Sequence, residues 1–285
     1  MADSDVSLMV AGLALGSALL HATWNALVKA SGDRLVMMAL VISVGGTVGG
    51  LATVFTGPPH PDQWLWLLGS VTTHSIYFFT LIQAYHAGDM SKVYPLSRGI
   101  APLLVVLFGW LVFGTVPTGR TLAGVALVSV GILAFALERG APRQGAAVFW
   151  ALVTGLGIGA YSLNDAHGVR AGGPDFRAAY IAWMFFLDAL PLGLVVIWVR
   201  RGRLLRLPGT MVRAGLGGGV ISTISFAVIV WAFSLGAPAG IVALRETSVV
   251  FGAVIGAVFL GEGFGTRRVL AACVVALGVL AIAVP

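Results

Sequence analysis

Two arginines lie inside apolar stretches of the sequence, where a charged side chain is unusual. Arg98 stands in "YPLSRGIAPLLVVLFGW", between Pro95 and Pro102, and Arg245 stands in "LRETSVVFGAVIGAVFLG", directly before Glu246. A guanidinium group binds a carboxylate or a phosphate through two parallel hydrogen bonds. Each arginine is therefore a candidate for binding an anionic group.

Arg98 permits three interpretations. In a helix it would lie about seven residues, or roughly 10 Å, from the start, where a lone arginine in lipid costs about 2.5–3.5 kcal/mol on insertion scales. It can extend to the membrane interface, pair with a buried acid or backbone carbonyls, or bind an anionic substrate. Pro95 and Pro102 each remove a backbone donor. This stretch is therefore either a broken, site-lining segment, as in transporters, or a helix with a simple kink.

Two acids also lie within apolar runs. Glu246 follows Arg245 directly, and neighbouring residues on a helix do not face each other, so their side chains have different surroundings. Glu246 is a candidate proton carrier or one half of a structural salt bridge. Asp188, in "WMFFLDALPLG", needs a partner or a proton at such a depth, and one of the arginines is a candidate partner.

Further polar and aromatic residues recur at helical spacing along the apolar runs. His21 and Asn25, for example, are four residues apart and share a helix face. Such residues offer amide, imidazole, hydroxyl and aromatic surfaces that suit a small polar or zwitterionic solute, and the alternative for each one singly is an interhelical hydrogen bond. The candidate substrate-binding residues of this kind are His21, Trp24, Asn25, His74, Tyr77, Tyr94, Tyr161, Asn164, Ser222 and Ser225.

Motif searches argue against several other kinds of site. The histidines have no HExxH or other metal spacing, and neither a GxSxG nor a P-loop motif occurs. We therefore predict no metal, no cofactor and no catalytic residue. The basic residues lie in short loops and form no basic domain, so nucleic acid is not an expected partner. The single cysteine excludes an internal disulfide.

The elements that position these residues are expected to be membrane helices. Of 285 residues, 58% are hydrophobic and 10% are charged, and the mean hydropathy is +0.98, whereas a soluble domain has about 25% charged residues. Backbone in lipid must satisfy its own hydrogen bonds, which favours an all-α helical bundle. At about 20 residues a span, the ten candidates are Ser7–Val28, Leu35–Phe55, Gln63–Tyr85, Ser91–Phe113, Arg120–Leu137, Ala146–Leu163, Phe176–Val199, Met211–Leu235, Pro238–Leu260 and Thr266–Val284.

The two halves of the chain repeat. A shift of 147 residues places Arg245 on Arg98, and a shift of 139 places Asn164 on Asn25. We therefore predict two five-helix repeats, over residues 7–138 and 146–284. Because five is odd, the copies enter the membrane in opposite directions, and such inverted repeats are typical of secondary transporters with a substrate site near the midplane. The matched arginines would then lie at two gates or at the two ends of one cavity.

Three stretches carry a family resemblance: "HATWNALVKASG", "AYHAGDMSKVYPLSRGIAPLLVVLFGWLVFG" and "GAPAGIVALRETSVVFGAVIGAVFLGE". With the doubling, they resemble the paired EamA domains of the drug/metabolite transporter superfamily over nearly the whole chain. The resemblance implies ten helices around a central cavity, lined mainly by the first, third, fourth, sixth, eighth and ninth, and movement of small metabolites, often outward. The first copy departs from the pattern, because Thr115 stands where the family usually has an acid, as in Gly261-Glu262.

We therefore predict a secondary transporter that exports a small polar, anionic or zwitterionic metabolite by alternating access. The expected partners are membrane lipid and a small-molecule substrate, with the protein as a monomer or weak homodimer in a bacterial inner membrane. Glycines four residues apart, such as Gly45 and Gly49, allow close helix packing within the chain or, alternatively, in a dimer. A membrane-embedded enzyme and a non-transporting sensor or assembly protein are the alternative functions.

The distribution of lysine and arginine predicts an orientation. The connections after the odd-numbered spans carry twelve of these residues, and the opposite side carries three. Because positive loops stay in the cytoplasm, both termini are expected outside. The family resemblance implies the reverse, with both termini inside.

Overall fold

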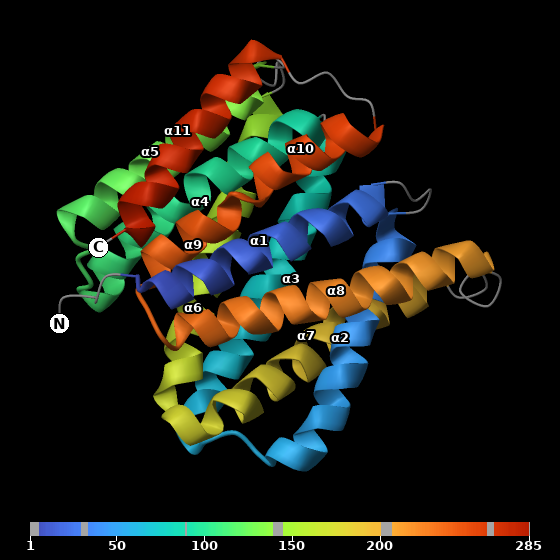
Figure 1. Cartoon of the computed structure of the whole chain (residues 1–285). Helices are drawn as coiled ribbons and strands as arrows, with labels where there is room; N and C mark the ends of the chain where they lie inside the picture. The colour runs from blue at the N-terminus through green and yellow to red at the C-terminus, as the bar shows by residue number, and fades with distance from the viewer. Residues whose placement is uncertain are drawn as a thin grey trace.

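The computed structural model describes residues 6–29, 34–88, 90–138, 145–200, 207–260 and 265–284, and within these ranges the chain is helical with no strand (Figure 1). Two short 3-10 helices, η1 (Pro61–Gln63) and η2 (Pro174–Phe176), precede α3 and α7. The α-helices are α1 (Leu8–Lys29), α2 (Arg34–Thr56), α3 (Trp64–Ala87), α4 (Met90–Phe113), α5 (Gly119–Glu138), α6 (Gly145–Ala171), α7 (Arg177–Arg200), α8 (Gly209–Phe233), α9 (Pro238–Glu246), α10 (Ser248–Leu260) and α11 (Thr266–Ala283).

The predicted spans appear as helices. Nine stretches of the described chain are long and apolar enough to cross a membrane, and α5 adds a shorter apolar stretch, Gly119–Phe135. One of the nine, Pro238–Val258, combines α9 with most of α10. The prediction of an all-α integral membrane protein is therefore confirmed.

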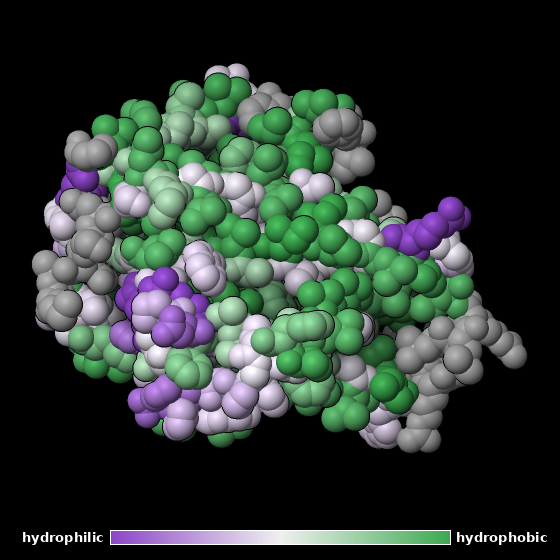
Figure 2. Space-filling view, turned by 60° about the horizontal axis from the view of Figure 1, so that its bottom comes forward, coloured by the Kyte–Doolittle hydropathy of each residue, from purple (hydrophilic) through white to green (hydrophobic). Residues whose placement is uncertain are grey.

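Large apolar side chains cover much of the outside of the bundle. Phe55 is 89% exposed and Trp198 is 73% exposed. In Figure 2 hydrophobic residues dominate the visible face, and the hydrophilic residues gather near its two ends. Exposed apolar surface on this scale would be a liability in water. It is the surface that contact with lipid chains requires.

Helices of the two halves pair in a regular way. Helix α2 packs on α7, α5 on α11 and α4 on α9, while α1 packs on α8 and α3 on α6 (Figure 1). If α9 and α10 are counted as one span, each helix of the first half corresponds to the helix five spans later. Exchanging corresponding helices leaves the first three pairs unchanged and converts the pair α1–α8 into the pair α6–α3. This pattern is what a two-fold relation between five-helix halves produces. The boundaries 7–138 and 146–284 remain a prediction.

Glycines allow the close approach of α2 and α7. A methyl group added at Gly46 would lie 2.3 Å from the Cβ of Ala189, and one at Gly49 would lie 2.6 Å from the carbonyl oxygen of Ala182. Real side chains do not reach such distances, so only glycine fits at this crossing. The glycines of α2 therefore serve helix packing within the chain, which was one of the two predicted roles.

Helix α6 is longer than the sequence pattern indicated. The sequence pattern predicts its end at Leu163, but the helix continues to Ala171. The polar residues after Leu163 find partners on neighbouring helices instead of water. The side-chain amide of Asn164, for example, donates to the backbone carbonyl of Trp66 on α3 at 2.8 Å.

The helix break also lies elsewhere than expected. Pro95 and Pro102 lie inside the continuous helix α4, so the interpretation of this stretch as a broken segment is wrong. The predicted single span Pro238–Leu260 is instead interrupted at Thr247. The Thr247 hydroxyl donates to the carbonyl of Leu244 at 2.6 Å, and its backbone N–H donates to the same oxygen at 3.3 Å. Such side-chain bonds to the preceding turn bend helices.

The two ends of the described chain lie on the same side. Side-chain atoms of Val6 and Ile282 both contact the position where a Cβ of Gly240 would be. An even number of spans requires this arrangement. Five of the twelve basic residues lie in segments 139–144 and 201–206, outside the described residues, as does Gly261-Glu262. The orientation therefore stays a prediction.

Candidate functional site

An ion pair between the two halves forms the centre of the candidate site. Nη1 of Arg98, on α4, donates to both carboxylate oxygens of Glu246, at the end of α9, over 2.9 and 3.2 Å. Arg98 is 3% exposed and Glu246 is fully buried. Of the three interpretations of Arg98, pairing with a buried acid therefore describes the structure.

Helices α1, α3 and α4 itself complete the surroundings of Arg98. Its Nη2 lies 3.1 Å from Nε2 of His21 and 3.4 Å from the hydroxyl of Tyr77. The guanidinium carbon lies 5.0 Å from the ring centroid of Tyr94, in a cation–π contact. Trp24 packs edge-on against His21, with ring centroids 5.1 Å apart. Together with Glu246, six of the predicted site residues thus lie in one cluster.

Arg245 lies beside this cluster and uses only part of its donor capacity. Its Nη1 donates to the hydroxyl of Tyr161 at 3.1 Å, and its guanidinium lies 4.8 Å from the ring centroid of Phe226. Its Nε is buried without a hydrogen-bond partner among the described residues. Buried donors normally have partners. An incomplete guanidinium of this kind is suited to an anionic ligand.

The two repeat-matched arginines do not lie at separate gates. Arg98 pairs with the residue that directly follows Arg245, and the rings of Tyr77 and Tyr161 meet at 5.3 Å between the two guanidinium groups. The alternative, that the arginines lie at two ends of one cavity, stays a prediction. Both cations belong to one central group of residues.

A second polar cluster adjoins the first at His74. Its ring stacks on Tyr161 with centroids 4.3 Å apart. Its Nδ1 lies 3.3 Å from Oδ2 of Asp188, and its Nε2 lies 4.0 Å from Oδ2 of Asp165. The hydroxyl of Tyr180 donates to Oδ1 of Asp165 at 3.2 Å. Among the described residues, the side chain that pairs with Asp188 is thus a histidine, and no arginine ion pair to it is present there.

Asp165 was missed in the sequence. The predicted span ended at Leu163, which placed this acid in a connection, where a carboxylate needs no explanation. In the structure it is fully buried inside α6. The signal that could have located it is spacing, because Asp165 lies four residues after Tyr161 and so shares its helix face.

The two predicted asparagines bind backbone groups outside the clusters. The amide nitrogen of Asn25 donates to the carbonyl of His21 in its own helix at 2.7 Å. Asn164 donates to α3, as described above. Repeat symmetry therefore does not bring their side chains together with the arginines. A direct substrate contact of either asparagine remains a prediction.

The predicted serines lie on α8. Ser225 and Ser17 each donate from the hydroxyl to the other's backbone carbonyl at 2.8 Å, which joins α8 to α1. Ser222 is half-buried one turn earlier. Ser225 thus shows the interhelical hydrogen bonding that was the alternative to substrate binding, and a ligand role for both stays a prediction.

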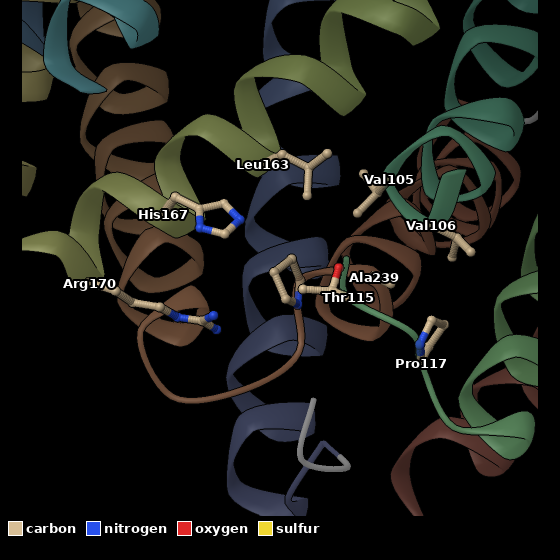
Figure 3. A pocket seen from close by; sticks show the side chains of 9 residues that line it. Val105, Val106, Thr115, Pro117, Leu163, His167, Arg170 and Ala239 are labelled. Carbon is tan, nitrogen blue, oxygen red and sulfur yellow. The ribbon is translucent and has the colours of Figure 1, made fainter. Parts of the chain in front are cut away.

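A small pocket lies along the same helices as the arginine cluster (Figure 3). Three of its residues, Val105, His167 and Ala239, lie six or seven positions from Arg98, Tyr161 and Arg245, which corresponds to about 9–10 Å along α4, α6 and α9. It also includes Thr115, the departure from the family pattern, from the loop between α4 and α5. The lining residues are Val105, Val106, Thr115, Pro117, Leu163, His167, Arg170, Pro238 and Ala239.

Within the ranges that the structure describes, no three His, Cys, Asp or Glu side chains converge in a way that could hold a metal ion. The clusters described above consist of guanidinium, imidazole, carboxylate, hydroxyl and aromatic groups.

Comparisons with known proteins agree with a transporter. Residues 8–137 match the model of the EamA-like transporter family. A riboflavin transporter of Vibrio cholerae is 36% identical over 75 residues, and the match spans 26% of this chain and 25% of that protein. A crystal structure of another protein has a TM-score of 0.77 at 18% identity over 96% of each chain. At that identity, the likeness shows the fold alone.

Proposed function

Because residues 8–137 match the model of the EamA-like transporter family, we propose that the chain is a secondary transporter that exports a small polar, anionic or zwitterionic metabolite by alternating access. The membrane would be the bacterial inner membrane. The substrate site would lie between the halves, where α1, α3, α4, α6, α8 and α9 contribute buried polar or aromatic side chains.

The observation that carries the proposal is the Arg98–Glu246 ion pair. It joins α4 of the first half to α9 of the second half, and Glu246 directly precedes the helix break at Thr247. Transporter sites typically lie at such interrupted helices between repeats, where backbone groups are open to ligands and the halves move against each other. A contact that joins the halves at this point is well placed to form in one state and break in another.

Arg245 is the proposed anchor of the substrate. Arg98 already shares its charge with Glu246, whereas Arg245 contacts a neutral hydroxyl and a ring and keeps an unfilled Nε. A carboxylate or phosphate would complete its hydrogen bonding. The pocket next to Leu163 and Ala239 would be the outer part of the route, because it follows the same three helices toward one end of the bundle.

A planar aromatic solute is the second candidate. The rings of His74, Tyr77 and Phe226 surround the ring of Tyr161, with centroids 4.3, 5.3 and 6.2 Å from its centroid. Ring systems of ligands pack well against such surfaces. The partial match to a riboflavin transporter supports testing flavins directly.

The test combines binding with counterflow. Purified protein is screened by thermal shift against organic acids, amino acids, nucleosides, sugars and riboflavin, and any solute that binds is tested for exchange in proteoliposomes. We expect Arg245→Gln to weaken an anionic or zwitterionic solute at least ~10-fold, about 1.4 kcal/mol. A riboflavin hit that Arg245→Gln leaves unchanged would favour the aromatic candidate.

The matched control is Arg213→Gln. Arg213 lies on the exposed surface of α8, where its Nε contacts the carbonyl of Gly209 in the same helix. The Arg213→Gln substitution removes the same charge as Arg245→Gln but leaves the buried clusters intact, so solute binding should be unchanged. The proposal fails if no solute exchanges across the membrane, or if both variants lower affinity equally.

A further inference from the structure

We propose that His74, Asp165 and Asp188 form a proton-binding site that couples transport to a proton gradient. The coupling rests on the proposed transporter function, whereas proton binding by the cluster does not. The three side chains come from α3, α6 and α7 and meet beside the arginine cluster without belonging to it.

Geometry places one imidazole between two carboxylates. Nδ1 of His74 faces Asp188 at 3.3 Å, and Nε2 faces Asp165 at 4.0 Å. Asp165 is fully buried, and His74 is 6% exposed. Unlike Glu246, neither aspartate has a salt bridge to arginine or lysine among the described residues. Two negative charges in so dry a place are costly unless a cation or a proton neutralises them.

Each member of the cluster has an unsatisfied atom. Nε2 of His74, Oδ2 of Asp165 and Oδ1 of Asp188 are buried with no hydrogen-bond partner in the described part of the chain. Buried polar groups in folded proteins are normally paired, so each exception needs an explanation. When a carboxylate takes up one proton, an O–H bond forms and the acceptor oxygen becomes a donor. Release of the proton breaks that O–H bond and restores the carboxylate. The cluster is therefore poised between two protonation states.

The charged and titratable surroundings favour exchange of a proton at this point. Within the described ranges, Nδ1 of His74 lies 3.2 Å from the hydroxyl and 3.1 Å from the backbone carbonyl of Ser70 on α3, and α8 contributes the Phe226 ring. On η1, Asp62 lies about 18 Å away along the chain by helical rise. The remaining groups that face the cluster are Tyr161 on α6, Tyr180 on α7, Arg245 on α9 and, beyond Tyr77, Tyr94 and Arg98 on α4.

Contacts connect the proton site to the proposed substrate anchor. His74 stacks on Tyr161, and the Tyr161 hydroxyl accepts a hydrogen bond from Arg245 at 3.1 Å. The charge of Arg245 acts on both His74 and Asp165. Protonation therefore changes the electrostatic field at the arginine that would hold an anion. This link gives proton and solute a physical means of influencing each other.

Infrared spectroscopy tests the proton site without any substrate. The probe is the C=O band of a protonated carboxylic acid in purified, reconstituted wild-type protein over a pH series. We expect a band of a buried acid that disappears as pH rises, and we expect Asp165→Asn and Asp188→Asn each to remove or shift it. The control Asp62→Asn, at an exposed position on η1, should leave it in place. A spectrum with no such band, or a band that neither variant changes, overturns the proton site.

Transport measurements test the coupling. With a solute that the wild type exchanges, Asp165→Asn should retain counterflow, which needs no net proton movement, and lose accumulation driven by a pH gradient. Retained counterflow also shows that the variant folds, and Asp188→Asn gives a second reading. Accumulation driven by sodium, or pH-driven accumulation that survives both variants, overturns the coupling. If the wild type exchanges no solute, the transporter function fails, whereas the infrared result still decides the proton site.

Discussion

At the scale of residues, the two arginines have different tasks despite their matched positions. Arg98 has an acid, an imidazole and a hydroxyl around it, so its charge is largely compensated within the protein. Among the described residues, the guanidinium of Arg245 has one side-chain hydrogen bond, to the Tyr161 hydroxyl, and one ring contact, with Phe226. Common ancestry of the halves explains the match in position, and the different neighbours explain why one arginine connects the halves while the other is suited to a ligand.

The Arg98–Glu246 pair leads to a prediction about stability. Arg98→Met alone should lower the stability of the folded protein by about 3–5 kcal/mol, because it leaves Glu246 buried without its partner. Arg98→Met combined with Glu246→Leu should restore much of the loss, since no buried charge remains. Thermal unfolding in detergent measures both. If the double variant is as unstable as the single one, the pair does more than neutralise charge.

At the scale of elements, α9 and α10 differ from their counterpart α4. The first copy keeps one continuous helix in spite of Pro95 and Pro102, whereas the second copy breaks at Thr247. A proline in a helix interior lacks one N–H but keeps a helical φ angle. The Thr247 hydroxyl instead takes over the carbonyl of the preceding turn. Movement in this bundle is therefore expected at α9 and α10 first.

The crossing of α2 and α7 leads to a second prediction. Gly46→Ala should destabilise the protein by about 1–3 kcal/mol, because the new methyl group would lie 2.3 Å from the Cβ of Ala189. The control Gly193→Ala places a methyl group in open space on α7, where alanine favours a helix. Unfolding temperatures of the two variants should move in opposite directions. Equal shifts would show that α2 and α7 separate without loss of stability.

The sequence predicted the elements better than the contacts between them. Apolar length and composition are local properties, so all ten spans were located. The end of α6 was missed because its polar residues are satisfied by other helices, as Tyr180 satisfies Asp165. The Arg98–Glu246 pair joins residues 148 positions apart, and no local pattern shows such a contact. Thr247 was overlooked because threonine is unremarkable in a helix.

At the scale of the whole molecule, orientation decides which end the pocket faces. The pocket residues Thr115, Arg170 and Ala239 belong to the connections and helix ends on the side of the two chain ends. If the loop charges determine topology, this side faces outward. The pocket would then lie on the release side of an exporter.

Reporter fusions test this orientation. Alkaline phosphatase fused after Pro285 should be active and a fluorescent protein there should be dark, and the same pair inserted at Gly57 should behave identically because both points lie on one side. If the fluorescent protein is dark and the phosphatase is also inactive at Pro285, that fusion is misfolded. The reporter pair at Gly57 then gives an independent reading of the same side. Bright fluorescence at both points would place the termini inside and overturn the charge-based prediction.

Val6 and Ile282 both lie beside Gly240, so the two ends of the described chain are close together and the path of the chain is nearly a closed ring. The path leaves the region of Gly240 through α1, passes through every helix and returns through α11 to the same place. The order of the two halves could then be exchanged by circular permutation. A gene that encoded the second half first, with a short linker between the present ends, would specify the same set of neighbours.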